Sequence, residues 1–429
     1  MTQLRVLICG GGITGNALAF QLSKLNHDVT VIERSPSLRT TGLQIDLRGS
    51  GIEVLKRMGL EEQFRAKAVD EEGTKVVDSS DRTWAYFKAN KSGKGLQSFT
   101  SDFEIMRGDL CRILYDATDN RVNYVFGKVV ESYEERNDCV EVLLSDGHRD
   151  RYDLLIGADG QASRTRKMML GPGTGDPIHY LGLHIGYFTM PRPKREREGY
   201  NATLYAAPGR RAILMRRHNP HQIQVYLQAG DNAHSERLEK VRKGDVAEEK
   251  KAMADIFQGA GWQTEEFLKG LEAADDFYCE RLGVVKMDSW SSGRVVLVGD
   301  AAYCPSAATG MGTTCGIVGA YILAGEIARH CHGSGTKTGL PAALKAYDDR
   351  FRPFINQVQD GIVEQASTWQ WLFPSSALAV AILNLVVAVV ALLRLDIIGK
   401  WILREDVGDW TLPDYEELVD GQIREDDPT

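Results

Sequence analysis

Three glycines near the start of the chain, Gly10, Gly12 and Gly15, have the spacing G-x-G-x-x-G. In this pattern the first glycine permits a tight turn, the second lets backbone approach a pyrophosphate, and the third lets a helix pack on a strand. The apolar periodicity that follows predicts a helix over residues 13–25. The first N–H groups of such a helix would face the phosphates. The spacing therefore predicts a dinucleotide site.

The segments around these glycines agree with that prediction. A strand-like run, residues 4–8, enters the motif, and a second predicted strand, residues 29–32, ends at Glu33. Glu33 lies eighteen residues past Gly15, where an acid can accept hydrogen bonds from a ribose. The alternative is a glycine-rich turn that binds no ligand.

A second glycine-containing motif, Gly299-Asp300-Ala301-Ala302, follows a fully apolar run at 295–298. Open α/β sheets place ligands at the carboxyl ends of such strands. Gly310 and Gly312 then leave backbone N–H groups bare at the start of a predicted helix, which suits an electron-rich flavin edge. The two motifs, with Asp159-Gly160 between them, indicate bound FAD. The alternative role for Asp300 is a helix cap.

Composition restricts the function classes further. The 429 residues exceed one ordinary domain, and 43% of them are hydrophobic, which suits a large core. The net charge of −8 argues against general nucleic-acid binding. Seven scattered cysteines without a C-x-x-C pair favour a reducing compartment. Without a visible secretory signal we expect a cytoplasmic protein, and no metal site is expected.

The character of the chain changes near residue 176. Successive strand-like runs at 179–190, 200–206, 211–217 and 222–228 resemble an antiparallel meander. We therefore predict an α/β fold: a Rossmann-like FAD-binding domain with an inserted antiparallel β-sheet substrate domain and a C-terminal helix. The expected divisions are 1–78, 102–175 and 280–365 for FAD binding, 79–101 and 176–279 for substrate, and 366–429 for the C-terminal helical segment and tail.

Residues 377–393 form an apolar run interrupted only by Asn384. A helix of this length measures roughly 25 Å at about 1.5 Å per residue, short of a hydrocarbon core of about 30 Å. We therefore predict a buried helix that covers the body of the protein and does not span a bilayer. Asn384 would then need a polar partner in the protein. Contact with a membrane is the alternative.

Three segments carry a resemblance to a known family. They are residues 42–51 (GLQIDLRGSG), 159–166 (DGQASRTR) and 299–312 (GDAAYCPSAATGMG). Over residues 4–365 the chain resembles the group A, single-component FAD-dependent aromatic hydroxylases, which include para-hydroxybenzoate hydroxylase. Residues 42–51 are most similar to the tetracycline-inactivating monooxygenase branch. The resemblance implies a para-hydroxybenzoate hydroxylase-like fold.

The resemblance also implies a reaction. FAD, bound non-covalently, would be reduced by NADPH or NADH as a transient co-substrate, and O2 would then form a flavin C4a-hydroperoxide. That oxygen would hydroxylate or epoxidise an aromatic or polycyclic, natural-product-like small molecule. The flavin carries this chemistry, so no protein acid or base is assigned.

The motifs and the resemblance together give the expected cofactor contacts. The resemblance places Arg34 beside the adenine, Arg107 against the cofactor and Gly42-Leu43 alongside the isoalloxazine. The full set is Gly10, Gly12, Ile13, Thr14, Gly15, Glu33, Arg34, Gly42, Leu43, Arg107, Asp159, Asp300, Gly310, Gly312 and Thr313. Many relatives have other residues at Tyr303, Ala307, Met311 and Thr314.

Substrate contacts should come from the inserted sheet. Strand alternation puts Met215 and Arg217 on one face of their strand, and Gln224 and Tyr226 on one face of the next. Either pair could instead face the core or solvent. With Pro305, these are the candidate substrate residues.

Three other functions remain open from the sequence. One is an FAD-dependent oxidase, dehydrogenase or cyclase that inserts no oxygen. Another is a non-enzymatic nucleotide-binding protein of similar fold. The last is a membrane-associated epoxidase, which the apolar run at 377–393 suggests.

Overall fold

The structure is a computed structural model. It describes residues 3–91, 102–196, 198–230, 232–241, 245–331, 337–364, 373–393, 408 and 410–419. Parts of the predicted substrate domain (92–101) and of the C-terminal segment (366–372, 394–407 and 420–429) lie outside the described residues.

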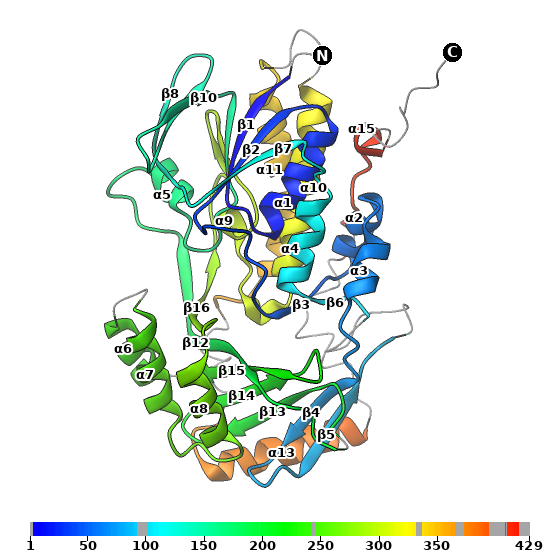
Figure 1. The fold of residues 1–429 in the computed structure, drawn as a ribbon, viewed down its shortest axis with the longest axis vertical. Coiled ribbons are helices and arrows are strands. Elements are labelled where there is room, and N and C mark those ends of the chain that lie inside the picture. Colours follow the sequence, from blue (N-terminus) through cyan, green and yellow to red (C-terminus); the bar gives the residue numbers. More distant parts are fainter. Residues whose placement is uncertain are drawn as a thin grey trace.

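A six-stranded sheet forms the centre of the upper half of the molecule in Figure 1. Its order is β17 (Ser291–Ser292), β18 (Val295–Leu297), β11 (Leu154–Gly157), β1 (Arg5–Cys9), β2 (Asp28–Glu33) and β7 (Val122–Phe126). All neighbours are parallel except β17, which pairs antiparallel with β18. Parallel strands are buried on both faces, which explains the continuous apolar runs in β1 and β18.

Different layers cover the two faces of this sheet. Val6 and Ile8 join a cluster with the helices α1 (Ile13–Lys24), α4 (Arg107–Asp116), α10 (Gly312–His330) and α11 (Leu340–Gln359). Leu7 and Cys9 pack instead on a three-stranded antiparallel sheet of β8 (Val130–Glu135), β9 (Val140–Leu144) and β10 (Arg149–Tyr152). The alternation along β1 thus builds a helix–sheet–sheet sandwich, and the predicted α/β fold is confirmed.

A seven-stranded sheet forms the lower half. Its order is β16 (Tyr278–Val285), β12 (Ile178–Pro191), β15 (Gln222–Ala229), β14 (Arg211–Arg216), β13 (Asn201–Ala207), β4 (Gly73–Val77) and β5 (Thr83–Lys88). The pairs are antiparallel except β4 with β13. Apolar residues of one face pack on α6 (Asn232–Lys240), α7 (Val246–Phe257) and α8 (Thr264–Ala273).

The expected domain boundaries need correction in this sheet. We predicted that the first nucleotide-binding segment ends at 78, but β4 already pairs with β13 of the lower sheet. The boundary at 279 likewise falls inside β16, which pairs with β12. Pairing between distant strands, which local patterns do not reveal, sets both limits.

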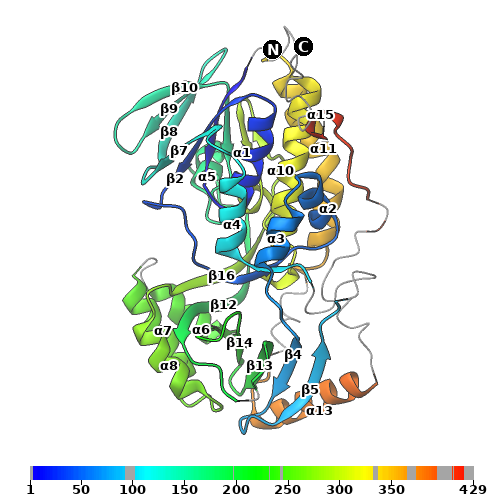
Figure 2. The same cartoon turned by 45° about the vertical axis from the view of Figure 1, so that its right-hand side comes forward.

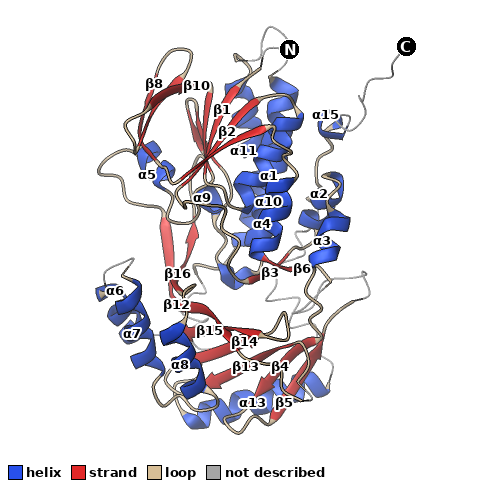
Figure 3. Cartoon of the chain, in the orientation of Figure 1, coloured by secondary structure: helices blue, strands red, loops and turns tan. Residues whose placement is uncertain are grey.

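Short elements connect the two halves (Figure 3). The two-stranded sheet of β3 (Gln44–Asp46) and β6 (Glu104–Met106) lies between them. The remaining elements are α2 (Ser50–Arg57), α3 (Glu61–Lys67), α5 (Arg164–Leu170), α9 (Asp300–Tyr303), the 3-10 turn Ala307–Thr309 and α15 (Glu416–Val419).

The helix α13 (Ala377–Leu392) lies across the lower end of the molecule, against β4, β5 and β13 (Figure 2). The prediction of a helix here is confirmed. The prediction that it is buried is wrong, because only Asn384 is buried and the strands cover one side alone. Oδ1 of Asn384 has no hydrogen-bond partner among the described residues. Within the described part of the chain, no helix has the length and apolarity needed to span a membrane.

Candidate functional site

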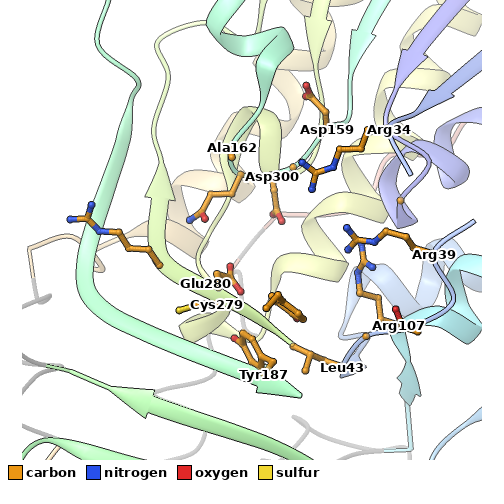
Figure 4. A pocket seen from close by; sticks show the side chains of 18 of the residues that line it. Arg34, Arg39, Leu43, Arg107, Asp159, Ala162, Tyr187, Cys279, Glu280 and Asp300 are labelled. Carbon is orange, nitrogen blue, oxygen red and sulfur yellow. The ribbon is translucent and has the colours of Figure 1, made fainter. Parts of the chain in front are cut away.

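One cavity of about 1010 Å³ opens between the two halves of the molecule. Figure 4 shows Asp159 and Arg34 toward one end, Tyr187 and Leu43 toward the other, and Asp300 and Glu280 between them. Nine of the residues expected to contact FAD line it: Gly10, Gly12, Glu33, Arg34, Gly42, Leu43, Arg107, Asp159 and Asp300. The others, Ile13, Thr14, Gly15, Gly310, Gly312 and Thr313, do not line it.

The first glycine motif forms the turn between β1 and α1. Gly10 adopts φ +114°, and a Cβ there would lie 2.5 Å from the Ala158 carbonyl oxygen. A Cβ on Gly15 would lie 1.9 Å from the carbonyl oxygen of Gly10. Only glycine fits both positions, because the nearest atoms belong to backbone. The third glycine therefore serves helix–strand packing, as the motif predicts.

The start of α1 is suited to an anionic group. Its N-cap, Gly12, makes no side-chain capping bond, and no acidic residue occupies the first turn. A Cβ on Gly12 would lie 3.7 Å from the Arg107 guanidinium. Bare N–H groups, the positive end of the helix dipole and a cation thus meet at one wall of the cavity. A pyrophosphate fits these residues.

Glu33 ends β2 with both carboxylate oxygens held by backbone. Oε2 accepts a hydrogen bond from Gly11 N at 2.9 Å, and Oε1 accepts one from Ser35 N at 2.9 Å. The carboxylate is thereby fixed beside the glycine turn, and its remaining lone pairs can accept from ribose hydroxyls. Arg34, the next residue in the chain, also lines the cavity and lies toward the same end as Asp159 (Figure 4).

Thr14 joins the two glycine motifs. A Cβ on Gly299 would lie 2.7 Å from its Oγ1, and a Cβ on Gly316 would lie 2.3 Å from the same atom. The side chain of Thr14 therefore packs between the turn before α9 and the first part of α10. This contact explains why α1 and α10 approach so closely, and it places Thr14 behind the cavity wall.

Asp300 directs its carboxylate into the cavity at the end of the strand β18 (Figure 4). Burial raises its pKa, while a hydrogen bond with Cys304 and the charge of Arg107 oppose that rise. A Cβ on Gly312, the first residue of α10, would lie 4.0 Å from Oδ1 of Asp300. An acceptor thus lies beside an uncapped helix start, an arrangement that fits the hydroxyls of a ribityl chain.

The loop at Gly42-Leu43 is held from two sides. Arg107 N donates to the Leu43 carbonyl oxygen at 2.8 Å, and Nε2 of Gln224 donates to the Gly42 carbonyl oxygen at 3.2 Å. Gly42 adopts φ +135° and packs against the Arg107 side chain. Arg107 thus positions the loop through its backbone and borders the cavity with its guanidinium.

The Asp159 carboxylate is already occupied within the protein. Oδ2 accepts from Arg164 N at 2.9 Å and from Thr165 N and Oγ1, both at 3.0 Å. Oδ1 accepts from the Ser163 hydroxyl. The carboxylate therefore caps the start of α5. It also stabilises the loop before α5, and residues of this loop line the cavity.

None of the five expected substrate residues lines the cavity. Met215 is the clearest correction: it packs in the apolar cluster under α7 and α8, on the far face of the sheet. Leu214, one residue away, belongs instead to the cluster that contains Leu43. The alternation of side chains along this strand was predicted, but Met215 was assigned to the wrong face of the sheet. A shift of one residue exchanges the face that packs on the helices with the face toward the cavity.

Arg217 is also a correction. Its side chain is buried, and its guanidinium donates to the carbonyl oxygens of Arg192 at 2.9 Å and Asn219 at 3.2 Å. It also pairs with Glu198 at 3.2 Å. Arg217 therefore stabilises the turn between β14 and β15 and does not reach the cavity.

Gln224 and Tyr226 lie one layer behind the cavity. Both are buried, and the Tyr226 hydroxyl donates to Oε1 of Gln224 at 3.1 Å. Tyr226 packs edge-on against Tyr187, which does line the cavity, with ring centroids 5.2 Å apart. Pro305 is buried behind the wall as well.

The residues that β12 and β16 present to the cavity were not predicted from the sequence. Tyr187, Tyr278 and Glu280 line it, and Tyr187 stacks on Tyr278 with centroids 4.8 Å apart. Burial, followed by the nearby Asp300 charge, raises the pKa of Glu280 to about 7, against a hydrogen bond from Tyr187 and the charge of Arg107. The one feature of the sequence that could have indicated them is the spacing of Tyr278 and Glu280. They lie two residues apart before an apolar run, which places both on one face of a strand.

Many relatives have other residues at four positions in and just after the second motif. In this chain most of these four side chains have structural roles. Tyr303 is buried, and its hydroxyl accepts a hydrogen bond from the Tyr347 hydroxyl at 3.0 Å. Oγ1 of Thr314 accepts from Arg48 N at 2.9 Å and so links α10 to the segment before α2. Met311 is buried, and Ala307 is exposed. None of the four lines the cavity.

Comparison with known proteins agrees with this geometry. The FAD binding domain family matches residues 3–361, and the chain belongs to that family. It is an FAD-dependent monooxygenase, so the alternatives of a non-enzymatic protein and of a non-oxygenating enzyme are set aside.

The relatives cover nearly the whole chain. An FAD-dependent monooxygenase of Sarocladium schorii, asL4, is 52% identical over 98% of this chain and 100% of its own length. The flavin-dependent monooxygenase eupH of a Phoma species is 44% identical over 87% of this chain and 88% of its own. Among solved structures, the tetracycline destructase Tet(55) superimposes with a TM-score of 0.77 at 27% identity, covering 96% of this chain and 99% of that one.

Proposed function

We propose that this monooxygenase uses NADPH or NADH and O2 to hydroxylate an aromatic or polycyclic, natural-product-like small molecule. The supporting observation is that one cavity joins two kinds of wall. One wall contains the glycine turn and Asp300, and the other contains Tyr187 and Tyr278. Its volume of about 1010 Å³ is at the upper end of the range of about 300–1,000 Å³ for drug-sized ligands. Cofactor and substrate can thus share one space.

FAD, when bound, supplies the redox and oxygen chemistry. The residues that would hold it non-covalently are the start of α1, Glu33, Arg107 and Asp300. Their task is to orient the cofactor and to exclude water from the reacting centre. We found no second glycine fingerprint in the sequence, so NADPH or NADH should dock transiently.

The aromatic wall supports the substrate class. Tyr187 and Tyr278 stack on each other, and Tyr226 supports Tyr187 from behind. Ring faces of this kind favour offset stacking with a flat aromatic ligand. The likeness to a tetracycline destructase, named for its action on tetracycline, also supports a polycyclic substrate.

Glu280 supports hydroxylation of a phenolic ring over epoxidation. Its pKa is raised to about 7 by burial and by the Asp300 charge, and its interaction with the neighbouring Tyr187 hydroxyl opposes this rise. A base with a pKa near the working pH is suited to proton transfer. We propose that Glu280 takes the proton of a substrate phenol, directly or through Tyr187. The resulting phenolate is more electron-rich and reacts more readily with an electrophilic oxygen.

The test is an isotope experiment on the FAD-loaded full chain. A panel of hydroxylated polycyclic aromatics would be screened for stimulation of NADPH and NADH oxidation, and the best substrate converted under 18O2. We expect one 18O atom in a hydroxylated product. A product without new oxygen, or with oxygen from water alone, would overturn the proposal. A diol with one oxygen from each source would indicate epoxidation followed by hydrolysis.

A further inference from the structure

The helix α13 has an inverted polarity. Its one polar residue within 377–392 is Asn384, and this is also its only buried residue. Seven of the eleven exposed large apolar side chains in the described part of the chain lie between 378 and 393, with exposed fractions from 44% to 81%. They are Leu378, Ile382, Leu385, Val386, Val389, Leu392 and Leu393.

These seven side chains form one continuous stripe. At about 100° per residue they fall within roughly 120° of the helix circumference, and Asn384 points to the other side. An ordinary surface helix shows the reverse pattern, with its apolar stripe on the core and its polar face in water. The sequence of α13 is therefore matched to an apolar medium outside the protein.

The position of α13 allows contact with a flat surface. It lies along the lower end of the molecule against β4, β5 and β13, far from the six-stranded sheet (Figures 1 and 2). Sixteen residues give a length of roughly 24 Å at about 1.5 Å per residue, which is too short to cross a hydrocarbon core of about 30 Å. The helix can lie in the plane of an interface but cannot span it.

The composition of the stripe favours lipid over protein as its partner. Protein interfaces are enriched in Tyr, Trp, Met and Arg and carry hydrogen bonds that fix a register. The stripe contains only Leu, Ile and Val, and no side chain on it can donate or accept a hydrogen bond. Lipid chains require neither register nor complementary shape.

Charge favours a neutral lipid surface. Interfacial helices that bind anionic lipid carry Lys and Arg on their polar face, whereas residues 377–393 contain no charged residue. The whole chain has a net charge of −8, which an anionic membrane repels. Binding should therefore come from apolar burial alone.

We propose that α13 docks the protein on a neutral, zwitterionic lipid surface, with the stripe from Leu378 to Leu393 inserted below the headgroups. This inference does not depend on the proposed reaction. It also differs from a membrane-spanning anchor, because the helix stays in the plane of the surface.

The test is flotation of the FAD-loaded full chain with phosphatidylcholine vesicles. We expect the protein to float with the vesicles, unaffected by salt and less strongly when phosphatidylserine is added. The double variant Leu385→Lys/Val389→Lys should lower the partition coefficient by about tenfold or more, because it places two charges in the apolar layer. Val246→Lys, an apolar residue of similar exposure on α7, is the matched control and should float like the wild type.

Three results would overturn the proposal. If the wild type does not bind the vesicles but forms a dimer, and the double variant is monomeric, the stripe binds a second copy of the chain. If the wild type stays monomeric without binding lipid, the stripe is not a docking surface. Binding only to anionic vesicles, lost at high salt, would assign attachment to charges elsewhere. FAD content verifies folding, and Leu392→Lys at the exposed end of α13 replaces the double variant if that variant fails to fold.

Discussion

The two walls of the cavity are built on different principles. The wall beside α1 is built around a backbone turn: Gly10 lines the cavity and Gly15 packs behind it, and a Cβ at either position would lie too close to a carbonyl oxygen. The wall beside β12 and β16 consists of side chains. Tyr187 projects from β12, and Tyr278 and Glu280 project from β16. The first wall tolerates few sequences, whereas the second can change residue by residue without altering the fold.

This difference separates cofactor binding from substrate choice. A backbone wall holds a constant ligand, and a side-chain wall can be adapted to different substrates. Variants in the first wall should therefore affect FAD retention and folding together. Variants in the second wall should affect turnover while FAD stays bound.

The largest effect is expected for Gly15→Val. Its Cβ would lie 1.9 Å from the Gly10 carbonyl oxygen, so α1 must move away from β1. We expect FAD retention to be lost and the free energy of unfolding to fall by about 3 kcal/mol or more. Absorbance of bound flavin and urea denaturation measure the two effects.

Gly175→Val is the matched control, because no atom lies within 4 Å of a Cβ at that position. It should retain FAD and unfold like the wild type. Normal FAD content in Gly15→Val would show that the backbone wall is more adaptable than its geometry indicates.

Glu280→Gln tests the side-chain wall. Because the pKa of Glu280 is raised to about 7, its basic form, and with it the wild-type rate, should increase as the pH passes about 7. The variant should lose about a hundredfold in kcat/KM at pH 8 and this pH dependence, while FAD content stays normal. Glu272→Gln, an exposed carboxylate on α8, is the control.

The same variant has a readout that is independent of turnover. Folding raises the pKa of Glu280 from 4.5 to about 7, so the folded state favours the protonated form. Its contribution to stability is therefore present at low pH and is lost as the pH rises through this window. Glu280→Gln should flatten that part of the stability profile. An unchanged profile would argue against the raised pKa.

Asp300→Ala changes the cofactor wall and should have a smaller effect than the preceding variants. Removing a charged acceptor costs about 1.5–3 kcal/mol, which corresponds to a rise of roughly ten- to a hundredfold in the Kd for FAD. Since burial raises the pKa of Asp300, FAD should also bind more weakly to the wild type at acidic pH. Fluorescence titration of the apoprotein with FAD measures both, and Asp138→Ala in an exposed turn serves as control. Wild-type affinity in Asp300→Ala would contradict a bond to the ribityl hydroxyls.

The sequence was most informative where the backbone decides the structure. The glycine motif and Asp300 each follow a strand, and Glu33 is the last residue of β2. Strands of a parallel sheet bring their carboxyl ends to one edge. The α/β fold and the cavity residues Gly10, Gly12, Glu33, Asp159 and Asp300 could thus be predicted from local patterns, whereas Arg34, Gly42, Leu43 and Arg107 came from the family resemblance. Domain limits could not, because β4 joins the lower sheet through pairing with β13, in which Gly73 lies opposite Asn201, 128 residues further along the chain.

The substrate wall was hidden from the sequence for a different reason. Alternation shows that Leu214 and Met215 point to opposite faces but does not say which face meets the cavity. That depends on where α7 and α8 pack, a tertiary contact. Glu280 looked like an ordinary strand residue, because its effect comes from neighbours distant in sequence such as Asp300 and Arg107.

The smallest effects come from a pair of variants one layer behind the cavity. Gln224→Met keeps the side-chain volume but removes the hydrogen bonds to Gly42 O at 3.2 Å and from Gln44 N at 3.2 Å. Losing them should cost about 1–2 kcal/mol and loosen the loop, with a roughly five- to tenfold loss in FAD affinity or kcat/KM. Met215→Leu, on the opposite face, should cost less than about 1.5 kcal/mol of stability and leave both constants unchanged. Both variants would be compared by flavin titration, steady-state kinetics and urea denaturation. If Met215→Leu shifts KM while Gln224→Met does not, the cavity side of this sheet has been assigned to the wrong face.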